Sequence, residues 1–426
     1  MATNNVKGTH DIIANEANAY SMVESLMKSL AELYGYNEVR PPVLEHTEVF
    51  ARGVGEASDV VRKEMYTFDD KGGRSITLRP EFTAGIMRLV IQNKLYATNE
   101  LPLKLYYCGP VFRYERPQLG RYRQFNQFGV ESVGNDSYFN DLEVIMMAYS
   151  MLISLGLTNV KLKINSIGDD NSRASYRNAL KEYFAPYIDN MCDDCKQRYE
   201  LNPLRILDCK VEEDIKIAAN APLVTEYLSK ESEERFNNIL LMLTQYDIPY
   251  EVDPHLVRGL DYYSETVFEF HYQSQNGNNY GAIGGGGHYH KLVKELGGPD
   301  LPGIGFSFGV ERLYNVLKDD GLLPEDEDKV FIYMMPMGLE ARKLALALAG
   351  DLRMSGYITD YCFDDCKIGA MFKRAEKKEA KYAIIIGDNE VNNNKVVIKD
   401  LNKQEQIEVP TDEVVDFFDK LTPNKE

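Results

Sequence analysis

Apolar residues in the N-terminal part of the chain follow helical and extended spacings in turn. Residues 17–34 place apolar side chains three and four positions apart, which predicts a helix that ends at Gly35. Residues 37–40 predict a short strand, which ends or reaches a sheet edge or interface at Pro41-Pro42, because proline cannot donate to a sheet ladder. Residues 74–79 predict a second strand, and residues 84–95 predict the helix that follows it.

The middle of the chain contains a long helical stretch between segments of strand-like spacing. Residues 140–156 predict an amphipathic helix, and residues 166–246 are mostly helical and highly charged, which indicates an inserted or appended helical module. Strand-like spacing returns at residues 267–272, 280–283 and 303–309. A run of four glycines, Gly284 to Gly287, follows the second of these segments, and a helix begins near Val310 after the third.

A Gly/Pro-containing acidic stretch near residues 318–328 separates this part from a different pattern. Beyond it, strands and helices alternate, at residues 330–335, 339–355, 357–362, 367–380 and 382–387. This alternation predicts an α/β unit with a largely parallel sheet. We therefore expect one domain over residues 1–320 with a helical insertion at about 167–250, a linker at 321–329, and an α/β domain over 330–426.

The composition narrows the classes of function. The chain has 426 residues, 44% of them hydrophobic and 27% charged, as in a globular protein of two or three domains. A net charge of −18 argues against a nonspecific nucleic-acid binder but leaves room for contacts through confined basic patches. No apolar stretch predicts a membrane span or a signal peptide, and we expect a cytoplasmic protein without a disulfide framework.

One short stretch of this acidic chain carries four arginines: Arg113, Arg116, Arg121 and Arg123. It reads FRYERPQLGRYRQFNQFGVE over residues 112–131, and its period-two pattern predicts two strands joined by a loop at residues 117–120. One face of this hairpin would carry arginines, an aromatic ring, an amide and carboxylates. That mixture suits a site for an anion and a flat ring, although a solvated edge hairpin is the alternative.

Three segments in order resemble the three motifs of class II aminoacyl-tRNA synthetases. They are GYNEVRPPVLEHTEVF at residues 35–50, the arginine-rich hairpin, and GIGFSFGVERL at residues 303–313. Two further segments, LVRGLDYYSETVFEF at 256–270 and GAIGGGGHYHKLV at 281–293, resemble the histidine-specific segments of the histidyl-tRNA synthetases, bacterial type. The resemblance extends through LNPLRILDCK at 201–210 and the C-terminal part.

The resemblance implies a fold and a reaction. The fold is an α+β catalytic domain built on an antiparallel sheet, with a helical insertion, followed by an α/β anticodon-binding domain. The reaction joins the carboxylate of L-histidine to the α-phosphate of ATP, releases pyrophosphate, and transfers histidine to the 3′ end of tRNA(His). Class II members of this kind are homodimers. The alternative is the noncatalytic, synthetase-like regulatory subunit of ATP phosphoribosyltransferase, which lacks the C-terminal domain and has degenerate catalytic segments.

The resemblance also implies site residues, and the reaction explains their chemistry. Both reactants are anions, so fixed cations such as Arg113 and Arg258 are the main means of stabilising the transition state. The implied histidine-binding residues are Glu81, Thr83, Arg113, Gln127, Glu131, Arg258, Tyr262, Tyr263 and Tyr289. The implied ATP-binding residues are Arg113, Glu115, Arg121, Phe125 and Arg312, and ATP brings Mg²⁺ held largely by phosphates and water. The implied contacts to the tRNA acceptor end are Arg116, Gln118 and Arg123.

Each of these assignments has a structural alternative. Arg258 can form a surface salt bridge with Asp253 or Asp261, Glu115 can pair with Arg116 or Lys104, and the tyrosines can be ordinary core residues. A glycine run can cradle phosphates, but no GxGxxG pattern opens a helix here, so close approach of the backbone to a ligand is favoured. The basic stretch Lys373, Arg374, Lys377, Lys378 and Lys381 is either a tRNA contact or a solvated helix face.

Three features depart from the family pattern or remain open. His288 and His290 replace the arginine and aspartate of the usual GGRYDG segment, and Phe82 stands where glycine is usual. The cysteines Cys192, Cys195 and Cys209 could be three zinc ligands, but the local sequence offers no convincing fourth ligand, and Asp208 or a distant residue are the only candidates. Free thiols and no bound metal are therefore expected.

Overall fold

The computed structural model describes residues 3–13, 15–55, 58–97, 100–117, 120–323 and 331–422. The chain divides into two compact units, residues 1–323 and 324–426. Most of the predicted linker, residues 324–329, lies outside the described residues, and the predicted domain boundaries stay a prediction. Within the described part of the chain, no helix is long and apolar enough to cross a membrane.

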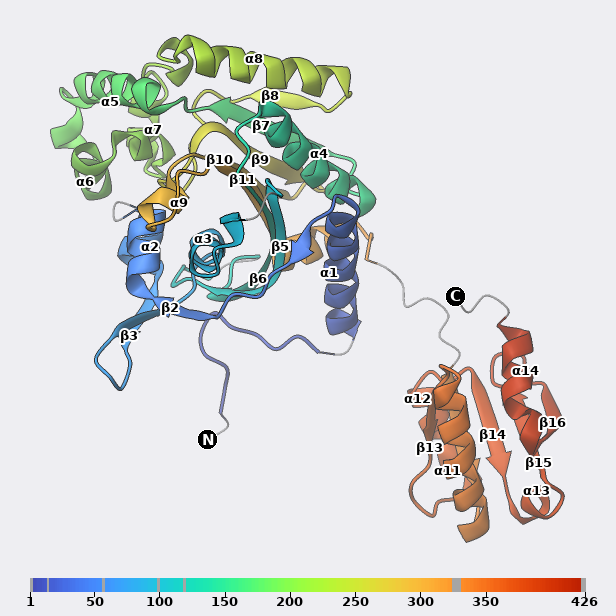
Figure 1. Ribbon diagram of the computed structural model, residues 1–426. Coiled ribbons are helices and arrows are strands. Elements are labelled where there is room, and N and C mark those ends of the chain that lie inside the picture. The colour runs from blue at the N-terminus through green and yellow to red at the C-terminus, as the bar shows by residue number, and fades with distance from the viewer. Residues whose placement is uncertain are drawn as a thin grey trace. The chain divides into compact units, whose positions relative to one another are not determined.

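An eight-stranded sheet forms the centre of the first unit in the described residues (Figure 1). Its spatial order is β1-β5-β6-β11-β10-β9-β7-β8. The strands are β1 (Asn37–Glu38), β5 (Leu103–Phe112), β6 (Gln124–Val133), β7 (Val160–Ser166), β8 (Tyr250–Val252), β9 (Ser264–Gln273), β10 (Asn279–Tyr289) and β11 (Gly303–Gly309). The five inner pairings are antiparallel and only the two edge strands pair in parallel, which confirms the predicted antiparallel catalytic sheet.

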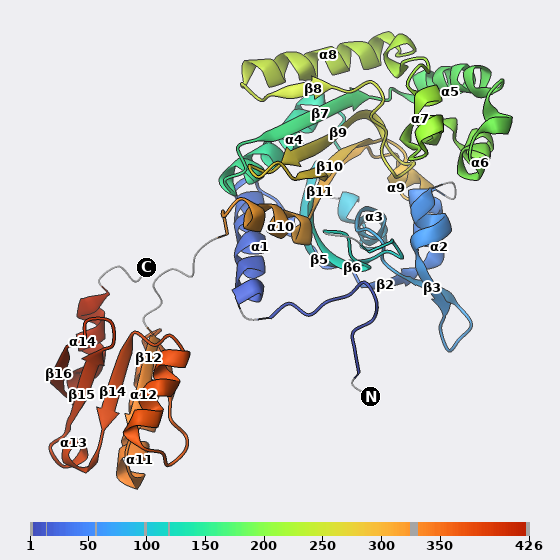
Figure 2. The ribbon, with the colours of Figure 1, turned by 180° about the vertical axis from the view of Figure 1, so that it is seen from behind.

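Helices cover both faces of this sheet. On one face, apolar residues of four helices pack into one core, and these are α1 (Asn15–Leu33), α4 (Tyr138–Ser154), α8 (Lys230–Gln245) and α10 (Val310–Asp319). The other face curves around the helices α2 (Thr47–Val54), α3 (Thr83–Gln92) and α9 (Leu292–Glu295), as both views show (Figures 1 and 2). A small sheet of β2 (Leu44–His46), β4 (Ser75–Leu78) and β3 (Tyr66–Asp69) leads into α3. This concave face holds the residues that the sequence analysis singled out.

The predicted helical insertion is present between β7 and β9. It contains α5 (Asp170–Phe184), α6 (Asp193–Leu201), α7 (Glu212–Ala218) and α8, with a 3₁₀ segment, η4, over Pro203–Asp208. Helices α5, α6 and α7 enclose a small core of their own, which includes Tyr176, Leu180, Cys195 and Ile206. The part from α5 to α7 therefore packs as a separate cluster, whereas α8 packs on the catalytic sheet.

The second unit is an α/β domain, as predicted, but its sheet is mixed. The strands are β12 (Phe331–Pro336), β13 (Ile358–Tyr361), β14 (Tyr382–Ile386), β15 (Lys395–Asp400) and β16 (Gln406–Pro410), in the order β13-β12-β14-β15-β16. Strand β12 pairs in parallel with β13 and β14, whereas β15 and β16 extend the sheet antiparallel, so the predicted largely parallel sheet is wrong for half of it. The helices are α11 (Leu339–Met354), α12 (Ile368–Lys377), α13 (Asp388–Asn392) and α14 (Val414–Leu421).

The arginine-rich hairpin differs from its prediction in where the strands end. Strand β5 stops at Phe112 and β6 starts at Gln124, so all four arginines lie in the connection rather than on strand faces. The period-two pattern in the sequence extends beyond the residues that pair between β5 and β6. An extended chain alternates its side chains whether or not it pairs with another strand, so the pattern does not mark where a strand ends. The predicted face of β6 is correct from Phe125 through Gln127 to Glu131.

Candidate active site

A cavity of about 380 Å³ opens on the concave face of the large sheet. Its size lies within the range of small-molecule sites. All the residues predicted to bind histidine or ATP line it: Glu81, Thr83, Arg113, Glu115, Arg121, Phe125, Gln127, Glu131, Arg258, Tyr262, Tyr263, Tyr289 and Arg312. Segments more than 200 positions apart along the chain therefore contribute to one site.

A buried carboxylate, Glu131 of β6, lies at the apolar side of the cavity. One of its oxygens accepts a hydrogen bond from the Thr83 hydroxyl at 2.7 Å, and the other accepts one from the Tyr289 hydroxyl at 2.8 Å. The residue is 1% exposed, and this burial raises the pKa of Glu131 to about 8 although both hydroxyl groups favour the ionised form. A carboxyl group poised in this way suits a ligand that presents a ring N–H.

Tyrosines surround this carboxylate. Tyr262 packs against Tyr263 with ring centroids 4.6 Å apart, and against Tyr289 edge to face at 5.8 Å. All three tyrosines are largely buried and also line the cavity. The same side chains therefore pack in the core and are placed to contact a ligand. The walls thus suit a small aromatic ring whose polar atoms need both donors and acceptors.

A second carboxylate, Glu81, lies at the start of α3. It accepts hydrogen bonds from the backbone N–H groups of Thr83 at 2.6 Å and Ala84 at 2.9 Å, which satisfies two of the free donors at the N-terminus of the helix. Burial raises the pKa of Glu81 above its ordinary value, against the effect of these hydrogen bonds. The helix therefore fixes this carboxylate where it lines the cavity.

Cations and one aromatic ring form the opposite part of the cavity. The Arg113 Nε donates to the Pro80 carbonyl at 2.8 Å, and its guanidinium lies 5.6 Å from the centre of the Phe125 ring. The Glu115 carboxylate is 3.8 Å from Arg113 and 3.6 Å from Arg121, rather than paired with Arg116 or Lys104. This arrangement combines a ring platform, an acceptor and two cations, the groups that a nucleotide needs.

Arg258 is held inside the cavity by a carboxylate that the sequence analysis missed. Its guanidinium pairs with Glu269 of β9, not with Asp253 or Asp261. Burial alone would raise the pKa of Glu269, but Arg258 and a hydrogen bond with His271 outweigh it and lower the pKa to about 2. The Arg258 Nε is buried without a hydrogen-bond partner among the described residues, which leaves a donor for a ligand in the cavity.

Arg312, in the first turn of α10, adds a further arginine from a distant segment to this part of the cavity, and its neighbour Glu311 lies beside it. Arg312 donates to the Ala282 carbonyl, and burial together with the nearby Arg121 lowers its pKa. Glu311, also missed by the sequence analysis, accepts from the backbone N–H of Asn126 at 2.8 Å, and burial raises its pKa to about 7. Both side chains line the cavity.

Glycines on β10 and β11 make room for these groups. A Cβ atom at Gly305 would lie 2.2 Å from Glu131 Oε2, and one at Gly286 would lie 1.9 Å from the Gly305 carbonyl oxygen. The run Gly284 to Gly287 lies inside strand β10, not after it, and its strand neighbours leave no space for side chains. Close approach within the sheet therefore explains the run, together with the access of Gly284 and Gly285 to the cavity.

Comparison with known proteins decides between the synthetases and other proteins that share such a sheet. A family model described as histidyl-tRNA synthetase matches residues 8–313, and one described as an anticodon binding domain matches residues 329–421.

The chain belongs to the histidyl-tRNA synthetase family.

Individual relatives match along almost the whole chain. The histidine–tRNA ligase of Geobacillus sp. (strain WCH70) is 44% identical over 98% of this chain and 99% of its own length. That of Bacillus subtilis (strain 168) is 45% identical over 97% of this chain and 98% of its own. The apo histidyl-tRNA synthetase of S. aureus superposes with a TM-score of 0.84 at 38% identity and covers 98% of this chain and 100% of its own.

Phe82, one of the two departures from the usual histidyl-tRNA synthetase pattern, is not among the residues that line the cavity. Its ring stacks on Tyr107 with centroids 4.3 Å apart, and the Arg79 guanidinium lies 3.9 Å from its centre. Tyr107 itself lines the cavity and was missed by the sequence analysis. The larger residue at position 82 therefore supports a cavity wall.

His288 and His290, the other departure, belong to a polar cluster beyond the cavity. His288 is fully buried, and its Nδ1 lies 3.0 Å from the Asp141 carboxylate, which also pairs with Arg235 at 2.7 Å. His290 Nε2 lies 3.4 Å from Asp136. Because alternate residues of β10 face opposite sides, Tyr289 keeps its place in the cavity between the two histidines.

Arg116 and Arg123, two of the predicted tRNA contacts, are not among the residues that line the cavity. Arg123 stacks on Tyr114, with its guanidinium 3.7 Å from the ring centre, and Arg116 is exposed. Gln118 lies outside the described residues. In the second unit, Arg374 pairs with Asp364 and Lys378 pairs with Asp360, while Lys373 and Lys377 are exposed on α12. Their contact with tRNA stays a prediction, as does the alternative of a solvated helix face.

Proposed function

We propose that the chain activates L-histidine with ATP and transfers it to tRNA(His), as a histidine–tRNA ligase. The observation that supports this proposal is that two different sets of side chains line one cavity. Glu131, Thr83 and Tyr289 form a buried polar pocket among tyrosines, and Arg113, Arg258 and Arg312 supply cations beside it. An amino acid with an aromatic, hydrogen-bonding ring fits the first part, and a triphosphate fits the second.

The residues divide the chemistry of activation as follows. The tyrosines and Glu131 hold the imidazole, and Arg113 and Arg258 hold the histidine carboxylate against the α-phosphate. A carboxylate oxygen attacks the α-phosphorus, the bond to the β-phosphate oxygen breaks, and pyrophosphate leaves. Arg113 and Arg258 then face the negative charge that grows on the nonbridging oxygens. Electrostatic stabilisation of this kind is usually the largest single term in the rate enhancement of an enzyme. Phe125 and Glu115 hold the adenine, and Arg121 and Arg312 hold the phosphates.

Transfer follows in the same cavity. A hydroxyl of the terminal ribose of tRNA attacks the histidyl carbonyl carbon, and AMP leaves. In the proposal, Arg116, Gln118 and Arg123 contact the acceptor end from the connection between β5 and β6, and the second unit contacts the anticodon. ATP would bring Mg²⁺, which would be held largely by the phosphates and water, and the Glu311 carboxylate, which lines the cavity, would offer a further oxygen ligand of the kind that this ion prefers.

Two properties of the assembly belong to the same proposal. A homodimer is expected to form through the segment around β1, the edge strand of the large sheet, and residues 41–50. Light scattering on the purified protein gives twice the chain mass if this holds. A cytoplasmic location follows from a role in translation.

The noncatalytic regulatory subunit of ATP phosphoribosyltransferase is not favoured. A solved structure titled as such a subunit or a histidyl-tRNA synthetase, from Bacillus halodurans C, has a TM-score of 0.64 at 21% identity, which shows a shared fold only. This chain instead matches named histidine–tRNA ligases over both of its units.

Histidine-dependent exchange of pyrophosphate into ATP tests the proposal. The expected result is exchange that saturates with histidine and is absent with other amino acids, measured with and without tRNA. If folded, full-length protein gives no exchange at saturating histidine under either condition, the proposal is wrong.

A further inference from the structure

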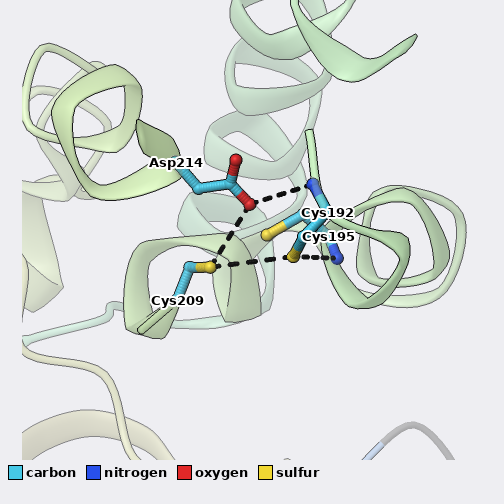
Figure 3. Close-up of side chains that lie close together, drawn as sticks. All are labelled: Cys192, Cys195, Cys209 and Asp214. Carbon is cyan, nitrogen blue, oxygen red and sulfur yellow. Dashed lines mark hydrogen bonds between the residues drawn. The ribbon is translucent and has the colours of Figure 1, made fainter. Parts of the chain in front are cut away.

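Three cysteines and one aspartate of the helical insertion converge on one point (Figure 3). Cys192 caps the N-terminus of α6, Cys195 lies in the first turn of that helix, Cys209 follows the segment η4, and Asp214 lies in α7. Their three sulfur atoms and one carboxylate oxygen all lie within 4.8 Å of one another. Three separate chain segments therefore supply one group of four ligand-type atoms.

The distances between these atoms match the edges of a coordination tetrahedron. With metal–sulfur distances of about 2.3 Å and a metal–oxygen distance of about 2.1 Å, a tetrahedron has S···S edges of about 3.8 Å and S···O edges of about 3.6 Å. The Cys192 and Cys209 sulfur atoms are 3.9 Å apart, and the Cys209 sulfur is 3.4 Å from Asp214 Oδ2. These two edges need almost no movement to receive an ion.

Burial makes the group unusual for free side chains. Cys195 is 0%, Asp214 2% and Cys209 5% exposed. Among the described residues no lysine or arginine pairs with Asp214, whose donors are the Cys192 N–H at 3.1 Å and the Cys209 thiol. A buried carboxylate without a cation is costly, and a divalent metal ion would supply the missing positive charge.

Backbone N–H groups already point at two of the sulfur atoms. The Cys195 N–H donates to the Cys192 sulfur and the Val211 N–H donates to the Cys209 sulfur, both at 3.4 Å. Donors of this kind stabilise thiolates and fix the direction of metal ligands. They are placed by the start of α6 and by the turn after η4, so the local fold orients the ligands.

We propose that Cys192, Cys195, Cys209 and Asp214 hold one Zn²⁺ ion. Three thiolates and one carboxylate suit zinc, whereas Mg²⁺ and Ca²⁺ prefer sites made entirely of oxygen ligands. Four protein ligands fill the tetrahedron, so the ion is structural and has no open position for a substrate. Asp208, the fourth ligand considered from the sequence, pairs with Lys210 instead.

The ion would fasten the segment that supports Arg258, a consequence that rests on the proposed function. The chain between Cys195 and Cys209 includes Asn202, which donates to the Asp261 carboxylate at 3.0 Å. It also includes Arg205, whose guanidinium donates to the Arg258 carbonyl at 2.8 Å. Fixing both ends of this segment therefore restricts the loop that carries Arg258 into the cavity.

Metal analysis of the full-length protein tests the site itself, without any substrate. The protein is produced with zinc in the medium, any affinity tag is removed, and the metal content is measured by mass spectrometry. We expect about one zinc ion per chain. Replacing zinc by Co²⁺ is expected to give a thiolate-to-cobalt charge-transfer band and the ligand-field bands of a tetrahedral site.

Matched variants locate the ion. Cys209→Ser and the nearly isosteric Asp214→Asn are expected to lose or weaken the metal, the second with a changed cobalt spectrum even when it stays folded. Cys108→Ser, on β5, and Cys366→Ser, in the second unit, are expected to retain about one ion per chain. The proposal is overturned if the protein carries no zinc and does not take up Co²⁺, or if Cys209→Ser keeps the full metal content. Because no substrate is used, failure here leaves the exchange result untouched.

Discussion

Arg258→Gln, compared with a double variant at Glu269, separates the catalytic role of Arg258 from its role in stability. Both variants are needed because the same guanidinium faces the cavity and pairs with Glu269. Removing a donor that stabilises developing charge lowers a rate by about 10²–10³-fold. The pKa of Glu269 falls from its ordinary 4.5 to about 2 in the folded protein. At about 1.4 kcal/mol per pKa unit, that lowering corresponds to a net stabilisation of the ionised Glu269 by about 3 kcal/mol, which is what remains of the attraction from Arg258 and His271 after the cost of burial.

The sign of this attraction fixes the assay conditions. Because the folded pKa of Glu269 is depressed, its contribution is fully present above pH 4.5 and is lost as the pH falls toward 2. At pH 7.5, Arg258→Gln therefore leaves a partly buried, ionised Glu269 without its arginine partner and is expected to lower the melting temperature by several degrees. The double variant Arg258→Gln/Glu269→Gln removes that stranded charge and is expected to regain most of the loss in melting temperature.

Pyrophosphate exchange measured on the same three proteins gives the decisive comparison. The double variant is expected to stay about 10²–10³-fold slower than the parent although its stability has recovered. Histidine binding, measured by calorimetry, should remain detectable in both variants. Recovery of the exchange rate together with stability would show that Arg258 acts only through the fold, and a single variant within about threefold of the parent rate would refute its catalytic role altogether.

Three further changes test other parts of the account. Glu131→Gln replaces an oxygen that accepts from the Thr83 or Tyr289 hydroxyl with an amide NH₂ group that cannot accept, so the KM for histidine should rise about 10- to 100-fold with little change in the KM for ATP; equal changes in both would contradict the assignment. Gly305→Ala places a Cβ atom 2.2 Å from the Glu131 carboxylate, and we expect loss of histidine binding or of stability, whereas Gly350→Ala, with nothing within 4 Å, should behave as the parent in both assays. The hydrogen bond to Asp136 raises the pKa of His290, so His290→Gln should lower the melting temperature most below about pH 6.5 and progressively less as the pH rises above it; a deficit that grows toward alkaline pH would show that the pair does not stabilise the fold.

The parts of the site that follow from local motifs were predictable from the sequence. Glu131, Gln127 and Phe125 alternate along one strand, so their shared face needed no knowledge of the rest of the fold. Arg258 and Tyr262 lie in a segment that resembles a histidine-specific motif. This resemblance predicted that they belong to the site, although the helical insertion separates them in sequence from β6. Strand periodicity therefore predicted the site residues on β6, and motif resemblance predicted those around Arg258.

Two of the groups that the sequence analysis missed depend on how neighbouring segments fold back on each other. Glu269 is a charged residue in β9, only eleven positions after Arg258, and its pairing with Arg258 explains why it faces the cavity. Asp214 lies five positions after Cys209 in sequence, but its carboxylate reaches the Cys192 N–H only because α6 and α7 both pack against η4. The single charge within VFEF was a usable signal for Glu269, whereas the sequence around Asp214 offers several acidic residues with no means of choosing among them.

Attachment of histidine to tRNA(His) is the reaction proposed for this chain, and a charging assay follows it without an intermediate step. Purified full-length protein, ATP, Mg²⁺, labelled histidine and tRNA(His) are combined, and label on the RNA is counted over time. We expect charging that requires ATP and tRNA(His) and falls about 10²–10³-fold with Arg258→Gln. Folded protein that binds histidine but leaves tRNA(His) uncharged, with ATP unconsumed, would contradict it.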